Sequence, residues 1–154
     1  MATITYKVTV ASGTTQYGTG NRFYINGELA PVLYLQEGNT YIFDQSDPSN
    51  AVGGVHQIAF SRNANNDPTA SYTSGVTSTG TPGSSGAQTT FNVAPVRTTG
   101  APLLFYYCTN HTGMGNTAQT ISPTSEVTEF NPQIDDIIEE AFERTGMRLS
   151  LIHI

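Results

Sequence analysis

The sequence predicts an all-β fold followed by one amphipathic helix near the C-terminus. Only 12% of the 154 residues are charged, whereas Gly, Ser, Thr and Asn are plentiful and β-branched and aromatic residues are well represented. The first group favours turns and the second favours strands. A chain of this length suits one domain of ordinary size with a short appendage.

Eight segments have the pattern of strands, either alternating apolar and polar residues or a short apolar run between turn formers. They are residues 4–10, 22–25, 32–36, 40–44, 55–60, 89–93, 103–107 and 117–121. In the first of them, Ile, Tyr and Val alternate with Thr and Lys. Residues 103–107 are almost continuously apolar or aromatic, which is typical of a central buried strand.

Turn-forming residues fill the segments between these strands. The predicted loops and turns are residues 11–21, 26–27, 37–39, 44–54 and 62–87. Asn26-Gly27 is a strong signal for a tight turn, and Asp47-Pro48 is another clear break. We expect the turn at 37–39 to join two paired strands, and residues 71–77 to form an edge strand within the long irregular stretch.

The sequence changes character after the last strand, at residue 121. Residues 122–130 predict a linker, and residues 131–146 predict an amphipathic helix that begins a second domain. Asn131 supplies an N-cap, Pro132 the first helical position, and Gly146 a C-cap signal. Apolar residues recur with the spacing of one helix face. These residues are Ile134, Ile137, Ile138, Ala141 and Phe142.

Charge and composition exclude several classes of partner. The net charge of −6 argues against nucleic-acid binding, which needs a concentrated basic face. No apolar run is long enough to cross a membrane, and residues 1–6 lack the basic and apolar segments of a secretory signal. A single cysteine cannot form an internal disulfide. We therefore expect no contact with nucleic acid or membranes, and the cellular location stays open.

Residues 106–115 concentrate metal-binding side chains in one short turn. Cys108, the only cysteine, is followed by His111 and Met114 in a Cys-x2-His-x2-Met arrangement. A blue-copper centre combines a thiolate with two imidazoles and a long axial methionine, so one further histidine is needed. His56, on a predicted strand far upstream, is the candidate.

The segment Tyr-Tyr-Cys-Thr-Asn-His-Thr-Gly-Met resembles the ligand loop of the cupredoxins, the blue type 1 copper proteins. The resemblance covers residues 30–121, because residues 35–43 and 56–60 match the segments that lead to the first histidine ligand. It implies a Greek-key β-sandwich over residues 1–121 that holds one copper ion and transfers single electrons.

The resemblance gives six residues a role. His56, Cys108 and His111 would be the equatorial ligands and Met114 the weak axial ligand, with Gln57 and Thr109 as their supporting neighbours. Thr109 would face Gln57. Gln57 stands where the family usually has an asparagine whose amide ties the two ligand-bearing segments together, a contact that tunes the metal.

Other interpretations of these residues are weaker. Taken alone, Cys108 would be a small buried apolar residue. A nucleophilic pair of Cys108 and His111 lacks a third residue to orient it, and such partners usually come from distant segments. A structural zinc site would favour more Cys or His ligands than are present. A copper ion with no open position leaves no place for a substrate, so we do not expect an enzyme.

Two functions follow for this domain. In the first, the domain carries electrons to a redox protein partner, and a periplasmic location would require a signal segment. In the second, the sandwich is a rigid scaffold in a phage virion, with or without copper. Residues 1–121 also resemble a module of marine phage virion proteins, and residues 131–146 resemble the opening of a phage neck or tail-assembly protein. Residues 149–154 resemble translated sequencing-adapter read-through.

Overall fold

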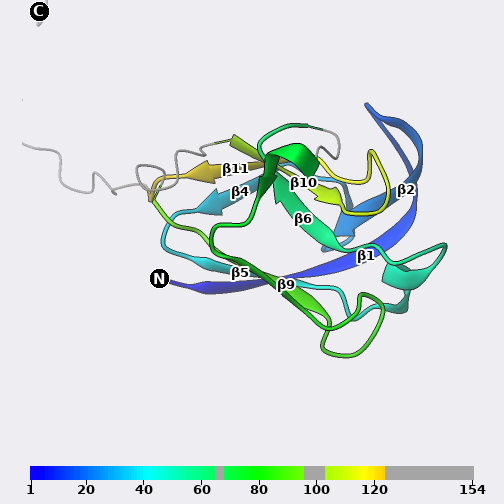
Figure 1. The fold of residues 1–154 in the computed structure, drawn as a ribbon, viewed down its shortest axis with the longest axis horizontal. Helices are drawn as coiled ribbons and strands as arrows, with labels where there is room; N and C mark the ends of the chain where they lie inside the picture. The colour runs from blue at the N-terminus through cyan, green and yellow to red at the C-terminus, as the bar shows by residue number, and fades with distance from the viewer. Residues whose placement is uncertain (65–67, 96–102, 124–154) are drawn as a thin grey trace, which may run out of the picture. The chain divides into compact units, whose positions relative to one another are not determined.

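The computed structural model describes residues 1–64, 68–95 and 103–123, which fold mostly as β-strands in two mixed sheets (Figure 1). This confirms the all-β prediction. All described residues belong to one compact unit, Met1–Pro123. The predicted helix 131–146 and the tail 149–154 lie outside the described residues, as does the predicted linker apart from its first two residues.

The first sheet has six strands in the order β3-β2-β1-β5-β9-β8. Their bounds are Thr3–Thr15 for β1, Gly18–Ile25 for β2, Glu28–Leu29 for β3, Thr40–Asp44 for β5, Val76–Thr79 for β8 and Gln88–Asn92 for β9. The long β1 pairs antiparallel with β2 and parallel with β5. Asn26 and Gly27, with φ of 50° and 84°, form the predicted tight turn between β2 and β3.

The second sheet has five strands in the order β4-β11-β10-β6-β7. Their bounds are Leu33–Gln36 for β4, Ile58–Ser61 for β6, Ser71–Tyr72 for β7, Leu103–Cys108 for β10 and Thr117–Ile121 for β11. β10 lies between β11 and β6, as expected for the most apolar segment. Two short 3-10 helices, η1 (Pro48–Ala51) and η2 (Pro68–Ala70), lie in the connections.

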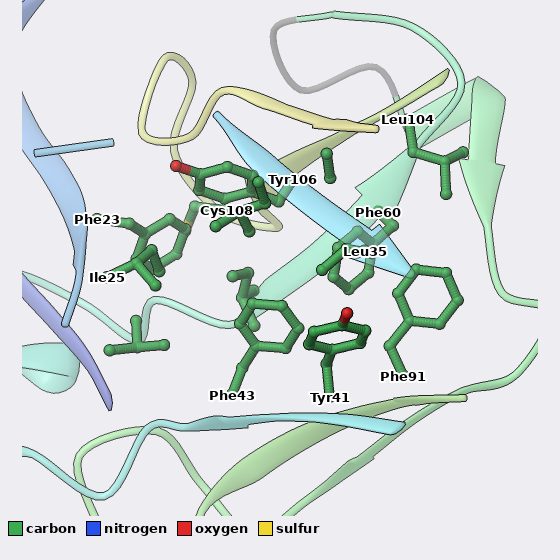
Figure 2. Close-up of a cluster of buried hydrophobic side chains, with 14 of the residues drawn as sticks. Phe23, Ile25, Leu35, Tyr41, Phe43, Phe60, Phe91, Leu104, Tyr106 and Cys108 are labelled. Atoms are coloured by element: carbon green, nitrogen blue, oxygen red, sulfur yellow. The ribbon is translucent and has the colours of Figure 1, made fainter. Parts of the chain in front are cut away.

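Aromatic side chains from both sheets meet in the core between them (Figure 2). Phe43 and Phe91 come from the first sheet and Phe60 from the second, and all three are fully buried. The Phe60 ring centroid lies 5.5 Å from that of Phe43 and 4.8 Å from that of Phe91. Strand alternation places one side chain in two on this inner face, so the two sheets share one hydrophobic core.

The predicted loop at residues 11–21 is wrong, because most of it is paired strand. β1 continues to Thr15 and β2 begins at Gly18, so only two residues form the turn. Thr14 and Thr19 face each other across the hairpin with their hydroxyl oxygens 2.8 Å apart. Threonine is β-branched and fits a strand, although a run of Thr, Ser and Gly also has the composition of a loop.

The strands on either side of the turn at residues 37–39 do not pair with each other, contrary to the prediction. β4 belongs to the second sheet and β5 to the first. The Glu37 N–H donates to the Ile121 carbonyl, and the Gly38 N–H donates to the Val93 carbonyl. The turn therefore carries the chain from one sheet to the other. The predicted edge strand 71–77 is likewise divided, into β7 and β8 at the edges of different sheets.

Asp47 is expected to make the fold sensitive to acid. Its carboxylate accepts hydrogen bonds from the Ser49 N–H and hydroxyl, at 3.0 and 2.7 Å. These bonds, helped by Lys7, lower the pKa of Asp47 below its ordinary value of 3.8. The Ser49 hydroxyl oxygen accepts in turn from the Val10 N–H, at 2.9 Å, so this contact ties η1 to β1.

Because the folded state binds the Asp47 proton more weakly than the unfolded chain does, its contribution to stability is present above pH 3.8 and is lost as the pH falls through the lowered pKa. We expect Asp47→Asn to remove that part of the pH dependence. The measurement is urea unfolding of both proteins between about pH 6 and pH 2. Parallel stability curves for the two proteins would contradict the prediction.

Candidate metal centre

Three side chains that bear metal-ligand atoms meet at one end of the second sheet. Cys108 is the last residue of β10, and His111 follows in the next loop. His56 precedes β6, which begins at Ile58 rather than at residue 55 as predicted. Cys108 is the register partner of Ile58. Pairing of the neighbouring strands therefore brings the distant histidine beside the cysteine.

Both imidazoles turn the same nitrogen toward the cysteine sulfur. Cys108 Sγ lies 3.7 Å from His56 Nδ1 and 3.6 Å from His111 Nδ1. The two ring centroids are 4.5 Å apart, and one ligand atom from each residue lies within 4.8 Å of the others. His56 and Cys108 are fully buried, whereas His111 is half-buried. This group can hold a metal ion.

Each of the two nitrogen–sulfur distances suits an ion bound to both atoms. With metal–nitrogen and metal–sulfur bonds of about 2.0 and 2.3 Å, nitrogen–sulfur separations of 3.6 and 3.7 Å correspond to angles of roughly 115° at the ion. Such an angle is close to trigonal for each nitrogen–sulfur pair. The ligand atoms of the three residues lie within 4.8 Å of one another, whereas two nitrogens that share one ion must lie within about 4 Å of each other.

The hydrogen bonding of His56 leaves its Nδ1 free to bind a metal. Its Nε2 lies 3.0 Å from the Val52 carbonyl oxygen. A carbonyl only accepts hydrogen bonds, so Nε2 must carry the proton. In the neutral ring, Nδ1 then presents its lone pair toward the Cys108 sulfur. A backbone carbonyl on the remote ring nitrogen is a usual means of orienting a histidine ligand.

A buried polar network, which no sequence pattern indicated, holds the backbone around His56. The Gln45 side-chain amide donates to the His56 carbonyl at 2.6 Å, and its oxygen accepts from the Ile58 N–H at 3.1 Å. The His56 N–H donates to the Asn50 carbonyl at 2.9 Å. Gln45 and Asn50 are both fully buried and hydrogen-bonded to each other.

We expect Gln45→Leu to lower the free energy of unfolding by about 1–3 kcal/mol, because the His56 carbonyl and the Ile58 N–H lose their buried partner. Metal affinity should fall as well, since His56 is no longer held. Gln16→Leu makes the same chemical change at an exposed position and should leave both properties unchanged. Denaturant unfolding and metal titration of the variants test this, and equal behaviour of the two variants would contradict it.

Gln57 and Thr109 are in contact, but through their backbones. The Thr109 N–H donates to the Gln57 carbonyl at 3.0 Å. The Gln57 amide points elsewhere and donates to Gln45 Oε1 and Thr89 Oγ1, at 2.9 and 2.6 Å. The side-chain tie between the ligand-bearing segments comes from Asn110, whose amide donates to the Val55 carbonyl at 2.7 Å. The position of Asn110 between two ligand residues was the only signal for this role.

The environment of the Cys108 sulfur disfavours an isolated thiolate. Burial raises the pKa of the Cys108 thiol, while backbone N–H groups of Asn110 and His111 act in the opposite direction. A cation beside the sulfur would favour the deprotonated form, because an opposite charge offsets the loss of solvation. The two backbone N–H groups therefore favour the thiolate, but burial opposes it more strongly. A bound cation would be needed to make Cys108 a thiolate at neutral pH.

Met114 is buried and belongs to the same hydrophobic cluster as Cys108. Its carbonyl accepts from the Phe23 N–H at 2.9 Å, which fixes the ligand loop against β2. Gly115 follows at a point where a Cβ atom would collide with the Tyr106 carbonyl. The loop can pass this close to β10 only because residue 115 has no side chain.

The outer edge of the site borders an open groove of about 550 Å³, which includes His111, Tyr17 and Asn110 in its lining. Gly54 lies close to the imidazole on another side, since a Cβ there would be 3.1 Å from His111 Cε1. His111 is thus the one member of the three-residue group with a route to the surface. Neither Gly54 nor the groove could be anticipated from the sequence.

The chain matches no protein-family model, and no curated protein matches it. The described helices include none that is long and apolar enough to span a membrane. The described residues nevertheless define a class of protein, a two-sheet β-protein with a buried His2Cys group that can hold a metal ion.

Proposed function

We propose that residues 1–121 form a Greek-key domain of the cupredoxin type that binds one type 1 copper ion and transfers single electrons. The equatorial ligands would be His56, Cys108 and His111, with Met114 as the axial ligand. The observation that carries this proposal is the convergence of both Nδ1 atoms on the cysteine sulfur at 3.6 and 3.7 Å.

The ligand chemistry supports copper over other metals. A thiolate and a thioether are soft ligands that favour copper, whereas methionine is an unusual partner for zinc. The two nitrogen–sulfur distances also suit copper held by two imidazoles and a cysteine. The bound ion would supply a one-electron couple between copper(I) and copper(II).

The protein's own residues would keep the site rigid and dry. Gln45 holds the His56 backbone, Val52 fixes its tautomer, and burial keeps water from His56 and Cys108. Similar geometry in both oxidation states lowers the reorganisation that an electron transfer requires. The half-buried His111 offers the shortest route for an electron to the groove. No position is left open for an organic substrate.

Titration of the metal-free protein with copper(II), followed by its visible spectrum, tests the proposal. We expect an intense blue thiolate-to-copper band that saturates at one ion per chain and is absent from Cys108→Ala. A wild-type protein with no such band, or a band that persists in Cys108→Ala, would overturn the proposed site.

A second experiment separates an electron carrier from a scaffold. The copper-loaded domain should be reduced and reoxidised rapidly by small redox proteins. If removal of copper lowers the melting temperature but the loaded protein exchanges electrons no faster than free copper, the ion serves only as a structural clip. That outcome would favour the scaffold function over electron transfer.

A further inference from the structure

Arg22, on β2, is a charged residue that the proposed copper site does not use. Its side chain is only 4% exposed. The guanidinium donates to the Thr15 hydroxyl at 3.1 Å and to the carbonyls of Asn21, Tyr17 and Gly18 at 2.7, 3.2 and 2.7 Å. All four acceptors are neutral, so they satisfy four of its five N–H groups without cancelling its charge.

No carboxylate pairs with Arg22 in the part of the chain that the structure describes, where the one ion pair joins Lys7 to Asp47. Arginine stays protonated in proteins, and a buried charge without an opposite partner is costly unless its surroundings compensate for it. A fixed positive charge is therefore buried in the β1–β2 hairpin.

This charge packs against the metal-ligand loop. Gly113 lies between His111 and Met114 in the sequence, and a Cβ on Gly113 would be 3.8 Å from the Arg22 Cζ atom. Arg22, His111 and Met114 also line one groove. The next residue of β2, Phe23, is hydrogen-bonded to the Met114 carbonyl. The hairpin therefore holds the guanidinium beside the loop, and the backbone bond of Phe23 ties the hairpin to that loop.

We propose that the positive charge of Arg22 sets the charge preference of the metal centre. It weakens the binding of a divalent ion at this site more than it weakens the binding of a monovalent ion. The consequence for copper rests on the proposed function. Arg22 favours the reduced state of the bound copper over the oxidised state and so raises its reduction potential.

The reason is the net charge of the metal with its thiolate ligand. Copper(I) and the Cys108 thiolate together are neutral, whereas copper(II) and the same thiolate carry one positive charge. Arg22 repels only the second combination, and burial strengthens this repulsion because the protein interior screens charge less than water does. An electron arriving from a redox partner removes that positive charge. The loop itself need not move.

Two substitutions separate the charge of Arg22 from its structural role. Arg22→Met removes the charge and the hydrogen bonds, whereas Arg22→Lys keeps the charge and loses the fork of donors. Both variants should unfold more easily than the wild type, so stability alone does not distinguish them. Lys7→Met is the control for net charge, since Lys7 is 66% exposed.

The first measurement is the reduction potential of the copper-loaded proteins, by spectroelectrochemistry with small mediators. At a fixed ambient potential, Arg22→Met should lower the ratio of reduced to oxidised protein about tenfold, which is a potential lower by about 59 mV. Arg22→Lys and Lys7→Met should stay within about threefold of the wild-type ratio. The proposal would be overturned if Arg22→Met kept the wild-type ratio of reduced to oxidised protein, or if Arg22→Lys lowered that ratio as far as Arg22→Met does.

The second measurement does not depend on copper chemistry. Affinities for silver(I) and cobalt(II) are determined by competition with chelators. Arg22→Met should gain about tenfold in cobalt(II) affinity relative to silver(I). If both ions bind but the ratio does not change, the role of Arg22 is wrong and the metal site stands. If neither ion binds, the metal site and the role of Arg22 fail together.

Discussion

The copper-loaded His111→Gly variant is expected to lose its blue band and to regain it when imidazole is added, whereas His56→Gly should lose the band permanently. Both histidines direct Nδ1 at the same sulfur. They differ in access, because His111 is half-buried at an open groove and His56 is fully buried. Free imidazole can therefore enter only at position 111.

The measurement is visible absorbance of each variant during an imidazole titration at a fixed copper(II) concentration. Circular dichroism establishes that both variants are folded. Recovery of the band in both variants would show that the site opens near His56 in solution. If the blue band returned in neither variant, the result would argue against His111 as a ligand that is accessible from the groove.

The largest loss of stability is expected from Phe60→Ala. Phe60 is fully buried between the two sheets and packs against Phe43 and Phe91 (Figure 2). Truncation removes apolar contacts and leaves a cavity that neighbouring rings cannot fill, so the free energy of unfolding should fall by about 3–5 kcal/mol.

Denaturant unfolding followed by far-ultraviolet circular dichroism measures this loss. Tyr34→Ala is the matched control, because Tyr34 is an aromatic residue of the same sheet but is 58% exposed. It should change stability by no more than about 0.5 kcal/mol. Similar losses in the two variants would mean that the shared core does not depend on Phe60.

The three-residue group that can hold a metal could be predicted because metal-binding residue types are rare in this chain. Cys108 is the only cysteine, and His111 and Met114 lie within six residues after it. His56 could be added because residues 55–60 have the pattern of a strand, although His56 itself precedes β6. His56 and Ile58 are both fully buried. The sequence contains no direct sign of the register between Ile58 and Cys108, which brings the histidine and the cysteine together.

The residues that support the site could not be predicted, because their role depends on burial. Gln45 and Asn50 lie in a polar, turn-rich segment whose composition is the same whether it is exposed or enclosed. Arg22 has the appearance of an ordinary exposed charge on a strand. Its burial results from the β1–β2 hairpin, and the run of Thr, Ser and Gly that forms this hairpin predicted a loop instead.

Strand positions were easier to predict than strand partners. A period of two shows which residues alternate between faces, but it does not say which strand lies alongside. The turn at Gly38 had the composition of a hairpin turn, yet its neighbours bond to Ile121 on one side and Val93 on the other. Such long-range hydrogen bonds decide the sheet order and cannot be inferred from local sequence.

The outer strands of both sheets have a consequence for self-association. β3 and β7 are two residues long, and β4 and β8 are four residues long. A long free edge is a template for pairing with another chain, whereas an edge this short offers few hydrogen bonds to an incoming strand. The β1–β2 hairpin is different, because β5 covers β1 only as far as Lys7 and β3 covers only Tyr24 and Ile25 of β2. Strand pairing with another chain is therefore expected at this hairpin rather than at the four short outer strands.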